Sequence, residues 1–248
     1  MEPRLPIVLL HGVGLDSSMW NLFRAELSRL TDREVVALDL PGHGGQPPLT
    51  EAVGLADLAS DIGARLPGRA HLVGFSLGAL IAQHLARYRP ELVASLTSVS
   101  SVCLRTPQEA SSVAARLQNA STDFQGSVEA SLERWFPAEA GTDTAAIAQV
   151  RSTLLANDPE SYLHAYRVFA TADSGIGAEL AGITVPSLAV TGDLDPGSTP
   201  DMTRRLGEAI PGARTAVVPE TRHMLPVERP AELAHIITEF IEEPRRDS

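Results

Sequence analysis

The strongest constraint on the fold is the segment Gly74-Phe75-Ser76-Leu77-Gly78, which lies between a strand-like apolar run and a helical pattern. The run 70–75 is predicted to be a buried strand, and the helix extends from about residue 77 to 89, before Pro90. A serine on so tight a strand-to-helix turn leaves room only for small residues two positions to either side. The turn also directs the N–H groups of the helix N-terminus toward the hydroxyl. The motif therefore predicts a nucleophilic serine, although a glycine-rich helix start with a capping serine would give the same pattern.

Strand-like runs alternate with longer helical patterns along most of the chain. Strands are expected at 7–10, 34–38, 70–75, 92–99, 187–191 and 214–218. Helices are expected at about 17–30 with Ser17 or Ser18 as the cap, from Thr50 to about 62, and at 77–89, 199–210 and 231–242. This alternation is typical of an α/β protein with a mainly parallel sheet covered by helices on both faces.

One long segment departs from this alternation. Between about residues 104 and 180 no strand is predicted, and the helical patterns lie at 113–117, 128–136, 145–155 and 162–170. We interpret this segment as a helical cap inserted after the fourth recognised strand. The expected organisation is a single structural domain, with a core formed by 1–103 and 181–248 and a cap formed by 104–180.

Charge and composition exclude several classes of function. The net charge of −11 argues against partners such as nucleic acid or an anionic membrane surface. All 20 basic residues are arginine, which excludes a Schiff-base lysine and a phosphate-binding-loop lysine. The single cysteine, Cys103, excludes an intramolecular disulfide and a cysteine-based zinc cluster. The first apolar run is too short for a signal peptide or a membrane span, so we expect a cytoplasmic enzyme with no cofactor and no metal.

A nucleophilic serine needs a base, and a carboxylate that orients this base. Among the seven histidines, His223 follows the last expected strand, in a loop that can reach the carboxyl edge of a parallel sheet. Two acids follow the preceding strand: Asp195, favoured because it lies in the loop proper, and Asp193, nearer the strand end. The expected order is thus Ser76, Asp195, His223.

Acyl transfer also requires N–H donors for the developing oxyanion. The main-chain N–H of Leu77, directly after the serine, is one candidate. The second is expected from His11-Gly12-Val13-Gly14, where glycines allow a close approach of the backbone, and we predict that Val13 is the donor. The alternative is that this segment only ends a strand.

Together these motifs resemble those of the α/β-hydrolase superfamily over nearly the whole chain. The matching segments are 11–14, 39–44, 74–78, 192–195, His223 and 228–230. Within the superfamily, the chain is most similar to 3-oxoadipate enol-lactonases and related carboxylesterases. The segments that carry this narrower likeness are 135–137, 157–162, 195–200 and 210–213.

The chain departs from the enol-lactonase pattern in two places. His11-Gly12 stands where enol-lactonases tend to carry Asn-Ser, and the usual N-terminal strand hairpin is absent because the first sheet strand is expected by residue 7. The opening segment and the turn 39–45 also resemble carboxylesterases that act on pimeloyl-type esters. The resemblance therefore implies a reaction class more firmly than a substrate.

The implied reaction is hydrolysis of a carboxylic ester or lactone through an acyl-enzyme, with Ser76, Asp195 and His223 as the triad. The same triad can cleave a C–C bond, or the amide of an acylaminomethylene-succinate type compound. A third hypothesis is a hydrolase-fold receptor with little turnover. The expected partner is a small-molecule ester or lactone, and the oligomeric state is open.

The substrates of the resembled lactonases are anionic, and a guanidinium group is suited to carboxylate recognition. Arginines of the cap are therefore candidates, although each can instead pair with an acid on a solvated helix face. Residues beside the catalytic segments can line an acyl pocket or simply pack in the core. The predicted substrate contacts are Trp20, Arg134, Trp135, His164, Arg167 and Met224.

Overall fold

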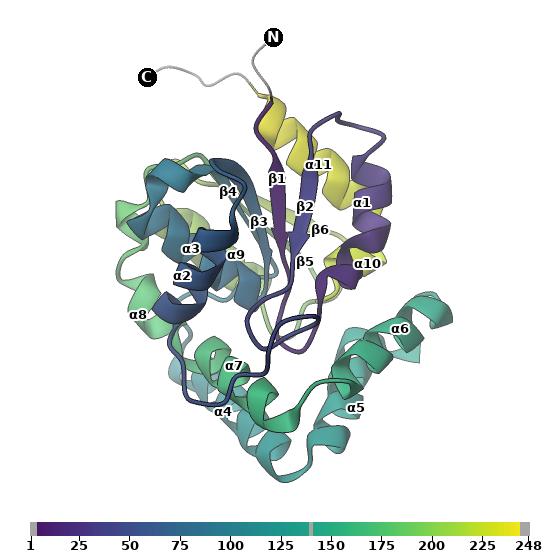
Figure 1. The fold of residues 1–248 in the computed structure, drawn as a ribbon. Helices are drawn as coiled ribbons and strands as arrows, with labels where there is room; N and C mark the ends of the chain where they lie inside the picture. The colour runs from purple at the N-terminus through teal and green to yellow at the C-terminus, as the bar shows by residue number, and fades with distance from the viewer. Residues whose placement is uncertain (1–3, 139–140, 244–248) are drawn as a thin grey trace.

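Six parallel strands form the centre of the molecule in a computed structural model that describes residues 4–138 and 141–243 (Figure 1). Their order across the sheet is β2-β1-β3-β4-β5-β6. The strands are β1 (Ile7–Leu10), β2 (Val35–Leu38), β3 (Ala70–Phe75), β4 (Val93–Val99), β5 (Ser187–Gly192) and β6 (Arg214–Val218). The expected α/β class and all six expected strands are confirmed, with ends that differ by at most one residue.

Strands β1 and β3 lie side by side at the point where the chain changes direction across the sheet. From β1 the chain moves outward to β2, whereas from β3 it moves the other way to β4. Gly74 of β3 is paired with Leu10 of β1 on one side and with Ser98 of β4 on the other. In open parallel sheets, ligands bind beyond the carboxyl ends of the strands at such a point. The loop after β1 and the turn after β3 both end there.

Helices cover both faces of the sheet, as the buried strand pattern requires. On one face lie α1 (Asn21–Leu27) and α11 (Pro230–Glu242), and on the other lie α2 (Leu55–Arg65), α3 (Leu77–Tyr88) and α9 (Pro200–Ala209) (Figure 1). Every residue of β1, β3, β4 and β5 is buried. Short elements in the described ranges include the 3₁₀ turns η1 (Ser17–Trp20), η2 (Pro90–Leu92) and η4 (Leu180–Gly182), and the helix α10 (Leu225–Glu228).

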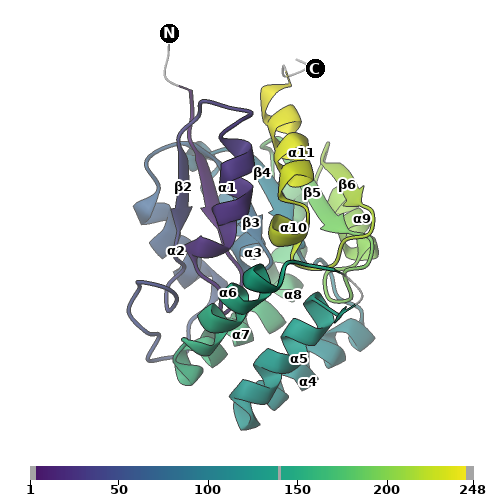
Figure 2. The ribbon, with the colours of Figure 1, turned by 90° about the vertical axis from the view of Figure 1, so that its right-hand side faces the viewer.

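The segment between β4 and β5 is helical, and its described residues contain no strand. Its helices are α4 (Pro107–Thr122), α5 (Phe124–Trp135), α6 (Thr144–Leu155), α7 (Pro159–Thr171) and α8 (Asp173–Gly177). Figure 2 shows α4 to α7 lying beyond the end of the sheet to which the strand arrows point. The cap boundaries at 104 and 180 stay a prediction. In the described ranges, no helix has the length and the apolar character needed to cross a bilayer.

Two expected helix starts are wrong. The first turn is a 3₁₀ turn capped by Asp16, whose carboxylate accepts the Ser18 N–H at 2.9 Å, rather than a helix capped by Ser17 or Ser18. Helix α2 begins at Leu55 and not at Thr50. Gly54 is extended and caps this helix, and its N–H donates to the Asp57 carboxylate at 2.8 Å, while the loop before it is held by the Leu49 N–H, which donates to the Ser161 hydroxyl at 2.9 Å.

Candidate active site

Ser76 lies on a strained turn at the end of β3. Its backbone has φ 53° and ψ −110°, a conformation that residues other than glycine rarely adopt. A Cβ atom on Gly74 would lie 2.2 Å from the Gly78 carbonyl oxygen, and one on Gly78 would lie 2.3 Å from the Leu10 carbonyl oxygen. Both glycines are therefore required by close main-chain approach, which is the steric reason for the spacing of the motif.

The main-chain hydrogen bonds of Ser76 hold this turn in place. Its N–H donates to the Val99 carbonyl of β4 at 3.0 Å, and its carbonyl accepts the Ala79 N–H at 3.1 Å. The side chain is nearly buried, with 5% of the residue exposed, and it borders a cavity beneath the cap. The strained backbone and the enclosed hydroxyl are both features typical of a nucleophile.

His223 and Asp195 form a close pair in the loops that follow β6 and β5. Nδ1 of His223 lies 2.7 Å from Oδ2 of Asp195, and both residues are buried. Because an ionised carboxylate only accepts, we assign the proton to Nδ1, which leaves Nε2 of the imidazole with a free lone pair. The other carboxylate oxygen accepts the N–H groups of Gly197 and Ser198 at 2.8 and 2.9 Å.

The two acids that follow β5 have different environments and different hydrogen-bond partners. Asp193 is exposed, and its carboxylate accepts the Thr221 N–H at 3.2 Å. Asp195 alone of the two contacts the imidazole. The His223 loop is anchored separately, since the Ser100 hydroxyl donates to the His223 carbonyl at 3.0 Å.

The loop after β1 approaches the serine closely and is held by a buried histidine. His11 donates from Nδ1 to the Gly12 carbonyl at 2.8 Å, while its Nε2 accepts the Leu40 N–H at 2.9 Å. Complete burial, with the charge of His43 adding to it, lowers the pKa of His11 to about 3. The neutral imidazole therefore holds this loop in place through one donated and one accepted hydrogen bond.

The two predicted oxyanion donors differ in their relation to the cavity, because Val13 lines it whereas Leu77 is fully buried and is not among its lining residues. Within the described ranges, neither the Val13 N–H nor the Leu77 N–H donates to a protein acceptor. Val13 lines the cavity, and a Cβ on Gly12 would lie 3.2 Å from Cβ of Ser76. Unpaired main-chain N–H groups next to a nucleophile are the kind of donor that can stabilise negative charge on a substrate oxygen.

The cavity lies between the sheet edge and the cap and is open to solvent, and its free space together with the adjoining solvent amounts to about 660 Å³. The core contributes Gly12, Val13, Leu15, Phe75, Ser76, Pro196, Gly197, Ser198 and His223. The cap contributes Arg116, Ser131, Arg134, Trp135, Tyr162, Tyr166 and Phe169. The described residues contain no group of three His, Cys, Asp or Glu side chains that could hold a metal ion.

The structure brings two of the six predicted substrate contacts to this cavity. Arg134 and Trp135 line it, and the Trp135 ring stacks on the His223 imidazole with centroids 5.5 Å apart. Trp20 and Met224 are fully buried in the core instead. His164 is half-buried, with Nε2 4.0 Å from Glu160.

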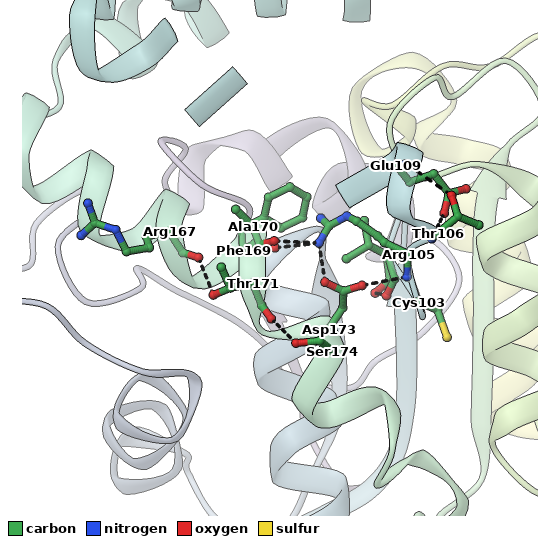
Figure 3. A network of polar contacts seen from close by, with 12 residues as sticks. Cys103, Arg105, Thr106, Glu109, Arg167, Phe169, Ala170, Thr171, Asp173 and Ser174 are labelled. Atoms are coloured by element: carbon green, nitrogen blue, oxygen red, sulfur yellow. Dashed lines mark hydrogen bonds and ion pairs between the residues drawn. The ribbon is translucent and has the colours of Figure 1, made fainter. Parts of the chain in front are cut away.

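Arg167 lies away from the cavity. It is exposed and borders a separate hollow together with residues of α2 and α3. Figure 3 shows its guanidinium pointing away from the Arg105–Asp173 contacts, while its carbonyl accepts the Thr171 hydroxyl at 2.9 Å. The predicted set also omitted Arg116 and an aromatic stripe on α7. The stripe, Tyr162, Tyr166 and Phe169, has helical i, i+4, i+7 spacing, which was a usable signal.

Comparison with known proteins identifies the family. A family model described as the alpha/beta hydrolase family matches residues 7–236. The chain belongs to the alpha/beta hydrolase family. The expected superfamily is thereby confirmed, and the chain is a hydrolase.

Relatives of this hydrolase carry three kinds of name. It is 29% identical to (E)-2-((N-methylformamido)methylene)succinate hydrolase of Acinetobacter baylyi over 96% of the chain and 90% of that protein. It is 32% identical to pimeloyl-(acyl-carrier protein) methyl ester esterase of Aeromonas hydrophila over 95% of the chain and 94% of that protein. The crystal structure of the enol-lactonase from Burkholderia xenovorans superposes with a TM-score of 0.86 at 26% identity, covering 97% and 92% of the two chains.

Proposed function

We propose that this hydrolase cleaves a carboxylic ester or lactone with Ser76 as nucleophile, His223 as base and Asp195 as the carboxylate that orients the base. The observation that carries the proposal is the convergence of the Ser76 turn and the His223–Asp195 pair on one cavity. Family membership and the names of the esterase and enol-lactonase relatives support it.

In the first half of the proposed reaction, the Ser76 oxygen attacks the substrate carbonyl while its proton passes to Nε2 of His223. The resulting oxyanion accepts hydrogen bonds from the Val13 and Leu77 N–H groups, each worth about 3 kcal/mol in the transition state. Asp195 stabilises the imidazolium. The intermediate collapses by breaking the bond to the alkoxide, which leaves with the proton that His223 held.

In the second half, water replaces the leaving alcohol. His223 accepts a proton from the water as it attacks the acyl-enzyme carbonyl. The second tetrahedral intermediate then releases the carboxylic acid, and the proton returns from His223 to the Ser76 oxygen. For a lactone, the alcohol and the acid are parts of one product.

Hydrolysis of p-nitrophenyl acetate by the wild type and by Ser76→Ala tests the proposal. We expect sustained turnover, reduced at least about 1,000-fold in the variant. A melting temperature close to that of the wild type serves as the control for folding. Turnover that survives the substitution would contradict the assignment of the nucleophile.

The competing hypotheses predict different results in the same assay. A receptor would release at most one equivalent of p-nitrophenol and then stop. A C–C or amide hydrolase would turn over a matched diketone or enamide faster than any ester or lactone. Either result would overturn the ester or lactone assignment while leaving the fold and the family unchanged.

A further inference from the structure

Two arginine side chains line the cavity from the cap, and no carboxylate of the described residues pairs with either of them. Arg116 of α4 and Arg134 of α5 are both half-buried, and both also border an outer hollow beside Asp123. In the described part of the chain neither forms an ion pair. Arg134 donates only to the Ala130 carbonyl and the Ser131 hydroxyl of its own helix, both at 2.8 Å.

Other arginines of the cap are neutralised. Arg105 forms a buried ion pair with Asp173 and donates to the Phe169 carbonyl at 3.1 Å, as Figure 3 shows. Arg151 pairs with Glu129 on the outer surface. Among the described residues of the cap, the arginines without an acidic partner are therefore the two that face the cavity and the exposed Arg167.

The two cavity arginines disfavour each other electrostatically. Burial lowers the pKa of Arg134, and the positive charge of Arg116 lowers it further. Two half-buried cations close together are unfavourable until an anion binds to both of them, and guanidinium groups bind carboxylates through paired N–H donors. The aromatic stripe of α7 borders the same cavity and supplies an apolar surface for the rest of a ligand.

We propose that Arg116 and Arg134 form a carboxylate subsite, so that the preferred substrate carries an ionised carboxyl group besides the bond that is cleaved. The proposal rests on the proposed function, because it assumes that this bond is cleaved at Ser76. It defines the substrate class as monoesters of dicarboxylic acids, or lactones that bear a free carboxylate.

Matched substrates test the subsite by kinetics. p-Nitrophenyl hydrogen adipate and p-nitrophenyl methyl adipate differ in charge at the far end but not in chain length. We expect the wild type to prefer the acid, and Arg116→Gln or Arg134→Gln to lower kcat/KM for the acid by about 10- to 100-fold, chiefly through KM. The ratio of kcat/KM for the acid to kcat/KM for the neutral ester should fall by the same order, so that the loss is specific to the charged substrate. Arg151→Gln, which removes a positive charge from the outer surface of the cap, should preserve the preference.

Calorimetry separates a failure of the subsite from a failure of the proposed function. Binding of monomethyl adipate and dimethyl adipate to the Ser76→Ala variant requires no turnover. We expect the acid to bind at least about tenfold more tightly, and this difference to disappear when both arginines are replaced by glutamine.

Several results would overturn the subsite. Equal affinity for monomethyl adipate and dimethyl adipate would do so. A preference for the acid that survives the replacement of both arginines by glutamine would do so as well. Displacement of monomethyl adipate by inorganic phosphate at lower concentrations than by adipate would contradict a carboxylate site. Preferential binding of the acid in a protein that hydrolyses no ester would support the subsite and overturn the proposed function instead.

Discussion

The sheet edge around Ser76 and the cap above it hold their polar side chains in different ways. At the sheet edge, Asp195 accepts two main-chain N–H groups and contacts His223, so its position is determined by protein atoms alone. In the cap, Arg116 and Arg134 face the cavity, and neither pairs with an acid among the residues that the structure describes. Asp195 and His223 are thus held in position without a substrate. The two cap arginines, by contrast, would gain an anionic partner only from a bound ligand.

This difference assigns separate roles to the two regions. Under the proposed function, changes at the sheet edge should slow the chemical step for every substrate, because the proposed mechanism has the groups there act on the reacting carbonyl. Changes in the cap should alter the choice among substrates and leave the chemistry of a neutral ester intact.

The largest effect is expected when the two acids after β5 are replaced separately. Asp195→Asn should lower kcat by about 10³- to 10⁴-fold, because the amide can no longer stabilise the imidazolium or fix its tautomer. Asp193→Asn is the matched control and should lower kcat by less than about threefold, because Asp193 is exposed and contacts a main-chain N–H instead. Steady-state hydrolysis of a neutral p-nitrophenyl ester measures both, and equal losses would contradict the separate roles of the two acids.

Glycine replacements compare the packing of the two regions. Gly78→Ala places a Cβ 2.3 Å from the Leu10 carbonyl oxygen, and main-chain atoms of a central strand cannot move aside. We expect it to lower the free energy of unfolding by more than about 3 kcal/mol, or to prevent folding. Gly175→Ala in α8 meets no atom within 4 Å and should be neutral or stabilising by up to about 1 kcal/mol. Urea unfolding distinguishes them, and a tolerated Gly78→Ala would contradict the close approach of β1 and α3.

The smallest effect concerns the buried histidine behind the loop after β1. The pKa of His11 is about 3 in the folded protein against 6.5 for an exposed histidine. Between these values the unfolded chain binds one more proton, so the free energy of unfolding falls as the pH drops below 6.5. The slope from this group is at most about 1.4 kcal/mol per pH unit.

His43 adds to this dependence in the same direction, because burial lowers its pKa as well. Urea unfolding of the wild type and of His11→Gln between pH 4 and 7 isolates the share of His11. We expect a smaller slope in the variant. An unchanged slope would show that His11 can be protonated in the folded state.

The residues at the carboxyl edge of the sheet could be predicted from the sequence because they follow the strands closely along the chain. Apolar runs such as 70–75 and 187–191 are short, strongly apolar and followed directly by the polar residues of the site. In a parallel sheet, all of these ends meet at one edge, so Ser76, Asp195 and His223 could be placed together without knowledge of side-chain contacts.

The cap could not be predicted to the same depth, because helical periodicity does not say which face of a helix meets the core. Arg116 and Arg134 lie on different helices, and only their tertiary arrangement brings both to one cavity. Arg167 has the same chemistry and an aromatic neighbour, yet it faces another hollow. The loop before α2 shows the same limit, since Leu49 is bound by a cap serine distant in sequence.

Covalent trapping of the nucleophile distinguishes Ser76 from every other hydroxyl group of the chain. The chain has arginine but no lysine, so trypsin cleaves after Arg69 and Arg87 and releases 70–87, in which Ser76 is the only residue with a hydroxyl group. After treatment with an alkyl fluorophosphonate, we predict one added phosphonyl group on this peptide, full loss of esterase activity, and far slower labelling of His223→Gln. Labelling of another peptide would contradict Ser76 as the nucleophile, and labelling at the same rate in His223→Gln would contradict His223 as its base.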